Sequence, residues 1–434
     1  MLLATLLCVV LLTGCAGGDG GDGGDRPAPR PTQIDRRLVV RHLGALQRIA
    51  ERSGGNRAAG TNGYRESAAY VARTLRDAGW RVRLARFRFP WWTERPSALR
   101  VGGLGAFRHG RDFRPLIYSG AGRADGSLRA VGSGCTDPDM AAIGPGDVAL
   151  ARPTGCLFRI KAANAERAGA GALLIADPTR SAGASTATLL SPRARVPVAI
   201  VRHALADRLR EGSRVRLRVD TEGGRRAGVS VIGQSAGSGP RVVMAGAHLD
   251  SVPAGAGLND NGSGVAALLA VAETTGPRAP GAPLRLGFWG AEEFGLYGSR
   301  SYVDSLGRGG TRRIAAYLNL DMVGSRNPVR AVYGASQSRP RARPAARRIA
   351  RLLRARVRPE ESTGGASDHV PFANAGVPVG GVFTGASARG PGGRPRDPCY
   401  HLGCDRLANV NLPVLVGLAR ATASTLAVLS RQAK

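Results

Sequence analysis

The chain has 434 residues, 43% of them hydrophobic, so it can bury a large core and form two domains. Lysine and arginine total 62 against 31 aspartates and glutamates, a formal net charge of +31. Only Lys161 and Lys434 are lysines, and the arginines are spread along the chain. We interpret this basic charge as solvated surface, with contact to an anionic surface as the alternative, and expect no specific binding to nucleic acid.

The first residues have the character of an export signal. Residues 1–12 form an apolar run too short to span a bilayer, and it closes with Leu12-Thr-Gly-Cys15, which resembles a bacterial lipobox. This resemblance implies a signal peptide at residues 1–14 and a lipid on Cys15, which would anchor the protein on the outer face of the cell membrane unless it is secreted. No Lys or Arg precedes the apolar run, which departs from the usual pattern. A flexible tether rich in Gly, Asp and Pro is expected at residues 15–33.

Export determines how the cysteines are interpreted. If Cys8 leaves with the signal and Cys15 takes the lipid, the cysteines that remain are Cys135, Cys156, Cys399 and Cys404. An even number is typical of disulfides in an oxidising compartment. We favour Cys399 with Cys404, closing a short loop around His401, and Cys135 with Cys156. A zinc site with four thiolates is the alternative, although neither pair has CxxC spacing.

In chain order, apolar periodicity predicts helices at residues 36–51 and 64–78, and alternation predicts a strand at 80–89. The segment GDVALARPTGCLFRIKAANAERAGAGALLI, from Gly146, then has the order strand, glycine turn, helix, strand. It resembles the protease-associated (PA) domain inserted in many exopeptidases, which has no catalytic activity of its own. We therefore expect a PA insert at residues 113–222, between the two parts of a catalytic domain at 34–112 and 223–434.

Beyond residue 229, strands alternate with helices. Strands are predicted at 241–247, 284–289, 314–320 and 377–383, and helices at 262–274, 343–354 and 412–429. This alternation predicts an α/β fold whose mostly parallel, mixed central sheet has helices on both faces, with a smaller β-rich α/β insert. Functional side chains are expected at the carboxyl ends of the strands.

Ionisable residues follow the predicted strands where such a site would lie. They are His248, Asp250 and Asp260 after the first strand, Glu292 and Glu293 after the second, Asp321 after the third, and His401 beside Tyr400. Individually, the glutamates could begin a solvated helix, Asp321 could be a cap, and His401 could pack on its disulfide. Together, imidazoles and carboxylates in this number favour zinc or another borderline divalent ion. Because neighbours in an extended segment point opposite ways, one glutamate can bind metal while the other faces the substrate.

The motifs around these residues resemble the dinuclear zinc aminopeptidases of peptidase family M28, most closely the secreted streptomycete type. They are HLDS from His248, NDNGSG from Asn259, WGAEEFGLYGS from Trp289, NLDMVG from Asn319, GGVFTG from Gly380 and DPCYHLGC from Asp397. The resemblance implies two Zn²⁺ per chain, and the implied ligands are His248, Asp260, Glu293, Asp321 and His401. Asp260 would bridge the two ions, and the partner of His248 on its ion, Glu293 or Asp321, stays open.

The implied reaction assigns a role to each remaining residue. Two cations would lower the pKa of a water between them, and Glu292 would take its proton and return it to the leaving amine. Tyr400 would donate its O–H to the oxyanion, and Asp250 would accept the second ring N–H of His248. The expected protein is a monomeric aminopeptidase acting on peptides with a free N-terminus. The alternatives within the same family are a carboxypeptidase or a dipeptidase. The alternative that is not an enzyme is a lipid-anchored binding protein for polyanions. A glutaminyl-cyclase-like activity is disfavoured, because Asp260 and His401 complete the set of ligands for two metal ions.

Overall fold

The computed structural model describes residues 34–179, 183–190, 192, 194–357 and 367–433. The predicted signal peptide, Cys15 and the tether at 15–33 lie outside these residues. The helices are α1 (Arg36–Arg52), α2 (Asn62–Asp77), α3 (Phe158–Arg167), α4 (His203–Ala206), α5 (Gly262–Thr275), α6 (Tyr297–Arg312), α7 (Arg343–Val357), α8 (His369–Asn374) and α9 (Leu412–Gln432).

A mixed sheet forms the centre of the larger part of the molecule. Its strands, in spatial order, are β1 (Arg81–Glu94), β10 (Thr221–Gln234), β12 (Leu284–Trp289), β11 (Val242–His248), β13 (Ile314–Leu320), β15 (Val379–Phe383) and β14 (Ala331–Tyr333). The four strands β12, β11, β13 and β15 run parallel, whereas β10, β1 and β14 are antiparallel to their neighbours. The predicted fold class is confirmed.

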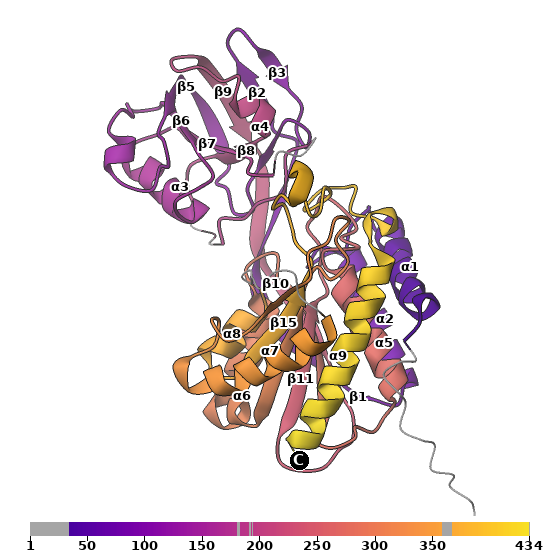
Figure 1. The fold of residues 1–434 in the computed structure, drawn as a ribbon. Helices are drawn as coiled ribbons and strands as arrows, with labels where there is room; N and C mark the ends of the chain where they lie inside the picture. The colour runs from indigo at the N-terminus through magenta and orange to yellow at the C-terminus, as the bar shows by residue number, and fades with distance from the viewer. Residues whose placement is uncertain (1–33, 180–182, 191, 193, 358–366, 434) are drawn as a thin grey trace, which may run out of the picture.

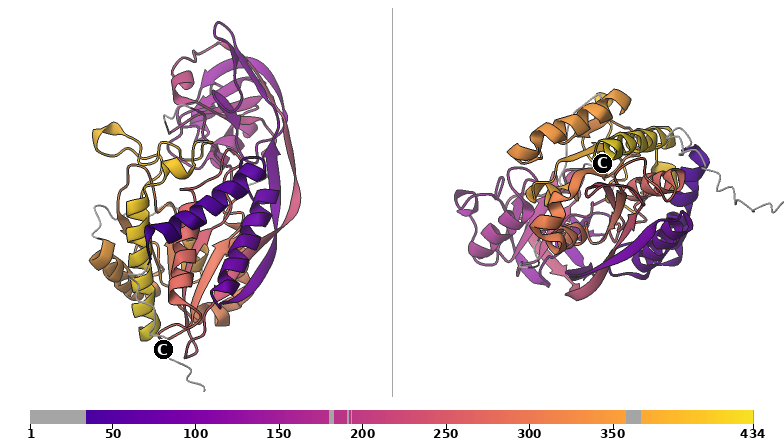
Figure 2. Two further views of the ribbon diagram at one scale, coloured as in Figure 1. Left: turned by 90° about the vertical axis from the view of Figure 1, so that its right-hand side faces the viewer. Right: turned by 90° about the horizontal axis from the view of Figure 1, so that it is seen from below.

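Helices cover both faces of this sheet (Figures 1 and 2). Helices α1, α2, α5, α7 and α9 share one apolar core with the sheet, and α6 and α8 pack on the opposite face. Because layers lie on both sides, every residue of β11 is buried, as expected for a central parallel strand. Among the described helices, α9 is long and apolar enough to cross a membrane, but it packs against α5 and α7, and 56% of its apolar window is buried, as in a core helix.

The smaller part contains a second sheet of eight strands. In spatial order they are β3 (Gly105–Phe107), β2 (Ala98–Val101), β9 (Arg214–Val219), β5 (Gly122–Ala130), β6 (Val148–Ala151), β7 (Ala172–Ala176), β8 (Val198–Val201) and β4 (Phe113–Pro115). The long strands β1 and β10, paired with each other, lead into and out of this part (Figure 1). Strands β2 and β3 precede residue 113, where the insert was predicted to begin, yet they join this sheet through β9. The chain changes sheets at the end of the continuous β1–β10 ladder, without a linker of distinctive composition.

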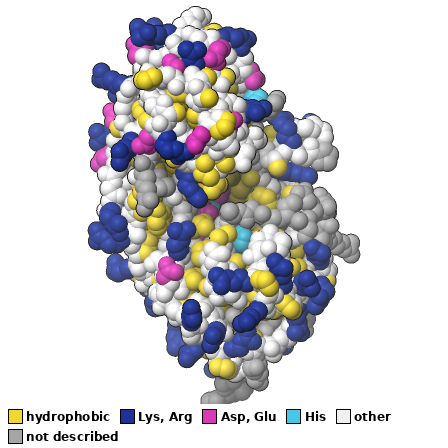
Figure 3. All heavy atoms as spheres, turned by 90° about the vertical axis from the view of Figure 1, so that its left-hand side faces the viewer, with side chains coloured by type: hydrophobic (Ala, Val, Ile, Leu, Met, Phe, Trp, Pro, Cys, Tyr) yellow, Lys and Arg dark blue, Asp and Glu magenta, His cyan; other side chains and the backbone are white. Residues whose placement is uncertain are grey.

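Disulfides join Cys135 to Cys156 and Cys399 to Cys404, the pairing that the sequence favoured. On the face shown in Figure 3, Lys and Arg side chains are scattered over both parts of the molecule, and a hollow lies between the two parts. This scatter is typical of solvated surface charge and not of one binding patch.

Candidate metal centre and active site

The predicted residues converge on one cavity of about 340 Å³. Seven of them line it: His248, Asp260, Glu292, Glu293, Asp321, Tyr400 and His401. Strand β11 ends at His248, β12 ends three residues before Glu292, and β13 ends directly before Asp321. The parallel strands therefore deliver these side chains to a single edge of the sheet. Asp250, the eighth residue, is fully buried beside the cavity.

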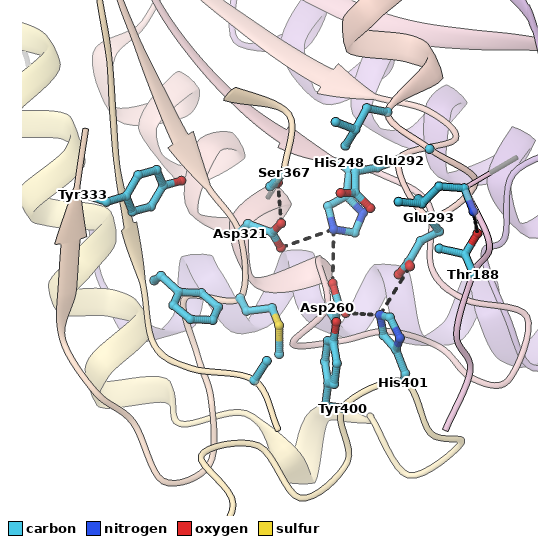
Figure 4. Close-up of a pocket in the computed structure, with 16 residues that line it drawn as sticks. Thr188, His248, Asp260, Glu292, Glu293, Asp321, Tyr333, Ser367, Tyr400 and His401 are labelled. Carbon is cyan, nitrogen blue, oxygen red and sulfur yellow. Dashed lines mark hydrogen bonds and ion pairs between the residues drawn. The ribbon is translucent and has the colours of Figure 1, made fainter. Parts of the chain in front are cut away.

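Asp260 lies between two imidazoles (Figure 4). Its Oδ1 is 3.1 Å from Nε2 of His248, and its Oδ2 is 3.1 Å from Nε2 of His401. A further carboxylate approaches each ring: Asp321 Oδ1 is 3.3 Å from His248 Nε2, and Glu293 Oε2 is 3.4 Å from His401 Nε2. Two candidate metal clusters therefore share Asp260, and the donor atoms of each lie within 4.8 Å of one another. His248, Glu292 and Glu293 form a third group that meets the same distance criterion.

Main-chain hydrogen bonds fix the loop that carries Asp260. The carboxylate of buried Asp405 accepts the N–H groups of Asn259 and Asp260, each at 2.9 Å. On the other side of this loop, the guanidinium of Arg57 donates to the carbonyls of Leu249, Ala256 and Gly257. Arg57 was not predicted as part of the site, because its loop carries no metal-binding pattern.

Asp250 orients the site through two different groups. Its main-chain carbonyl accepts the hydrogen bond from His248 Nδ1 at 3.0 Å, whereas its carboxylate Oδ1 lies 3.8 Å from that nitrogen. The carboxylate instead accepts the N–H groups of Glu292 and Glu293, at 3.2 and 3.3 Å. Asp250 therefore accepts the ring N–H of His248 through its main-chain carbonyl, because its carboxylate is engaged by the glutamate segment. With Nδ1–H donated, Nε2 of His248 is the free ligand atom.

The insert also reaches the cavity. His401 Nδ1 donates to the main-chain carbonyl of Thr186 at 2.7 Å, and Thr188 and Leu190 of the same loop line the cavity. On its other side, the ring of His401 stacks on that of Tyr400, with centroids 3.9 Å apart. This contribution was not predicted, because residues 183–190 of the insert include no ionisable side chain that could mark them.

Several carboxylates are buried together with few positive charges to balance them. Burial and the nearby Asp260 raise the pKa of Glu293 to about 8, and burial together with Glu293, Asp368 and Asp321 raises the pKa of Glu292 well above its ordinary value. Burial opposes protonation of His401, but Glu293 and Asp260 outweigh it and raise the pKa of His401 to about 9. Oε1 of Glu293 is buried without a hydrogen-bond partner among the described residues. These nitrogen and oxygen donors and this excess of buried negative charge fit divalent cations of the zinc type.

A doubly covered α/β sheet with two imidazole–carboxylate clusters sharing one aspartate, and a further glutamate beside them, defines the site of a metal-dependent hydrolase. Comparison with known proteins specifies the family. The family model described as "Peptidase family M28" matches residues 230–426, and the PA domain model matches residues 115–209.

Relatives with known names agree with this match. The chain is 35% identical over 414 residues to the probable lipoprotein aminopeptidase LpqL of Mycobacterium tuberculosis, covering 87% of this chain and 81% of the relative. It is 43% identical over 197 residues to leupeptin-inactivating enzyme 1 of Streptomyces exfoliatus, covering 42% of this chain and 44% of that relative. Among solved structures, BSAP, a zinc aminopeptidase from Bacillus subtilis, is similar with a TM-score of 0.70 and 25% identity, over 92% of this chain and 95% of that chain. The chain belongs to peptidase family M28 and carries an inserted PA domain, so the predicted family and class of enzyme are confirmed.

Proposed function

We propose that this protein is an aminopeptidase that removes the N-terminal residue of peptides and holds two zinc ions per chain. The observation that carries the proposal is the position of Asp260, 3.1 Å from an imidazole nitrogen on each side. It supports one ion held by His248, Asp260 and Asp321, and the other by Asp260, Glu293 and His401. We therefore propose Asp321 rather than Glu293 as the partner of His248 on its ion.

Zinc, when bound, polarises the scissile carbonyl and lowers the pKa of the attacking water. Glu292 lines the cavity but belongs to neither cluster that contains Asp260. Its pKa, raised by burial and neighbouring carboxylates, suits a base that accepts a proton from water and then donates it to the leaving amine. Burial, together with the charges of Asp260 and Glu293, raises the pKa of Tyr400 well above its ordinary value, so its O–H stays protonated and can donate to the developing oxyanion.

The lining of the cavity supports an aminopeptidase over a carboxypeptidase. A carboxypeptidase must hold the C-terminal carboxylate of its substrate, yet the described residues that line the cavity include no Lys or Arg. The acidic residues of the cavity instead favour a substrate with a free α-amine. They would also repel the polyanions that a binding protein of the alternative kind would bind. The apolar part of the wall, formed by Leu190, Leu296, Met322 and Phe383, suits an apolar N-terminal side chain.

Hydrolysis of aminoacyl p-nitroanilides tests the proposal. We expect release that a zinc chelator abolishes and added Zn²⁺ restores, with no release from the same compounds after N-acetylation. Glu292→Gln should still bind two zinc ions by elemental analysis, while kcat falls about 10²- to 10⁴-fold through loss of the base. Glu66→Gln, at an exposed position on α2, is the matched control and should leave kcat unchanged. Failure to cleave any anilide would defeat the proposal, and a near-normal rate in Glu292→Gln would remove that residue as the base.

We also propose that the mature protein is a lipoprotein held by Cys15 on the outer face of the cell membrane. The lipobox-like sequence supports this, as does the similarity to a relative named as a lipoprotein. Metabolic labelling with a radioactive fatty acid should mark the wild-type protein but not Cys15→Ala. An unlabelled wild-type protein in the soluble fraction would contradict the anchor.

A further inference from the structure

The two histidines of the site are held by the same kind of bond but from different parts of the chain. His248 donates Nδ1–H to the carbonyl of Asp250, two residues further along its own strand end. His401 donates Nδ1–H to the carbonyl of Thr186, 215 residues away in the insert. The N–H of Thr186 donates back to the carbonyl of His401 at 3.3 Å, so two hydrogen bonds join the segments.

We propose that residues 183–190, the insert loop, position His401 for zinc binding, so that the PA insert completes the second metal cluster. With Nδ1–H donated to Thr186, the nitrogen left to bind metal is Nε2, which faces Asp260 and Glu293. Thr188 and Leu190 of the insert loop also line the cavity, and Figure 4 labels Thr188 among the side chains around it. This inference rests on the proposed function, because it concerns the same zinc site.

The insert loop is itself fixed on both sides of Thr186. Asp177, buried just after β7, accepts the N–H groups of Thr179 and Ser185, each at 2.7 Å. Further along, the carbonyl of Ala187 accepts the N–H of Ile117, and the N–H of Leu189 donates back to Ile117. The framework of the insert therefore determines where the carbonyl of Thr186 lies.

The hydroxyl of Thr186 has no part in this arrangement. It is buried and has no hydrogen-bond partner among the described residues, whereas the main-chain N–H and C=O of Thr186 both bond to His401. What matters is the position of the Thr186 carbonyl, and not the chemistry of the Thr186 side chain. The most specific test therefore weakens the hydrogen bonds by which Asp177 holds the insert loop.

Asp177→Asn replaces one accepting oxygen by an NH₂ group that faces a main-chain N–H, and so loosens the insert loop without touching the cavity. In the purified full-length protein, zinc titration against a chelating dye should show one of the two sites weakened about 10- to 100-fold, the usual effect of losing a bond to a metal-binding histidine. The other site should keep its affinity. We expect kcat to fall while KM for a short anilide changes less than twofold, and hydrogen exchange at the Thr186 amide to become faster.

Two controls separate positioning from general damage. Asp139→Asn alters a carboxylate elsewhere in the insert that also accepts main-chain N–H groups, those of Cys135 and Thr136, and should leave both zinc affinities unchanged. Thr186→Val replaces the unpaired hydroxyl by a methyl group and keeps both main-chain hydrogen bonds to His401, so it should also leave both zinc affinities unchanged. If Asp177→Asn does not fold, Thr186→Gly, which frees the main chain at this point, should weaken the same zinc site.

The inference is overturned if a folded variant with faster exchange at residue 186 binds both zinc ions like the wild type and keeps its kcat. A wild-type protein that binds no zinc and cleaves no anilide would instead defeat the proposed function itself.

Discussion

Arg57→Met tests how firmly the metal-binding loop is held. The guanidinium is fully buried and donates to three carbonyls of the turn between His248 and Asp260, at 2.9 Å to Ala256, at 2.8 Å to Gly257, and to Leu249. Methionine fills similar space but donates nothing. A buried carbonyl left without its donor costs ~1–3 kcal/mol, so three cost ~3–9 kcal/mol.

Part of this loss is offset, because burial of the guanidinium is itself unfavourable and lowers the pKa of Arg57 to about 10, despite the nearby Asp250, Asp405 and Asp260. We therefore expect the free energy of unfolding to fall by ~3–6 kcal/mol, measured by urea unfolding of the chelator-treated protein. At saturating zinc, the free energy of unfolding should differ even more between the wild type and Arg57→Met. Zinc stabilises only the folded state, and the loosened loop of the variant binds it more weakly.

Arg52→Met is the matched control. This arginine lies nearby at the end of α1, its side chain is 62% exposed, and its contact with Glu66 is 3.5 Å long. Its loss should change the free energy of unfolding by less than ~0.5 kcal/mol. An Arg57→Met protein that unfolds within ~1 kcal/mol of the wild type, with the same dependence on urea, would refute the reasoning, because the three carbonyls would then have other donors.

Two further predictions concern protons and disulfides. After chelation, the melting temperature should fall as the pH rises from ~5 to ~9. In the folded chain the pKa of His401 is raised from 6.5 to about 9, and that of Glu293 from 4.5 to about 8. Both groups therefore hold protons more tightly in the folded chain than in the unfolded one, and the stability that this contributes is lost as the pH rises. A melting temperature that rises over this range would contradict the assigned shifts. Replacing Cys399 and Cys404 by Ser should cost ~2 kcal/mol of stability and lower zinc affinity, whereas replacing Cys135 and Cys156, which close a longer loop, should cost ~3 kcal/mol and leave kcat unchanged. Urea unfolding and zinc titration check both pairs, and equal zinc affinities in the two variants would contradict the assignment.

The parallel strands were predictable because burial on both faces gives them continuous apolar runs. Strands β12 and β13 were predicted at their observed bounds. Strand β10 was missed, since its fourteen residues include four glycines and resemble a loop. It becomes a strand because β1 pairs with it over its whole length and β12 pairs with its last residues, a tertiary effect that no local pattern records. Helix α6 was missed for a related reason: it contains several glycines, including Gly307, whose positive φ of 59° is non-helical, and it is held by packing on β1 and α8.

The side chains of the site were predictable, but the atoms that hold them were not. The motifs place imidazoles and carboxylates at strand ends, and the structure brings them to one cavity. Arg57 and Thr186, however, act on or through main-chain carbonyls, and Asp250 orients His248 by its carbonyl and not by its carboxylate. A sequence distinguishes side chains, whereas every residue has a carbonyl, so the positions of these acceptors follow only from the folded backbone.

These supports make metal binding and the docking of the insert interdependent. If the insert loop raises the zinc affinity of the cluster at His401 by some factor, zinc must strengthen the hold of His401 on the insert loop by the same factor, since the coupling of two binding equilibria is reciprocal. Without cations, burial and the neighbouring charge of Asp260 raise the pKa of Glu293 to about 8, so protons balance the charge of this cluster and zinc would take their place. The amide of Thr186 should therefore exchange more slowly in the zinc-loaded protein than after chelation, although none of the described residues of the insert lends a side chain to the metal clusters.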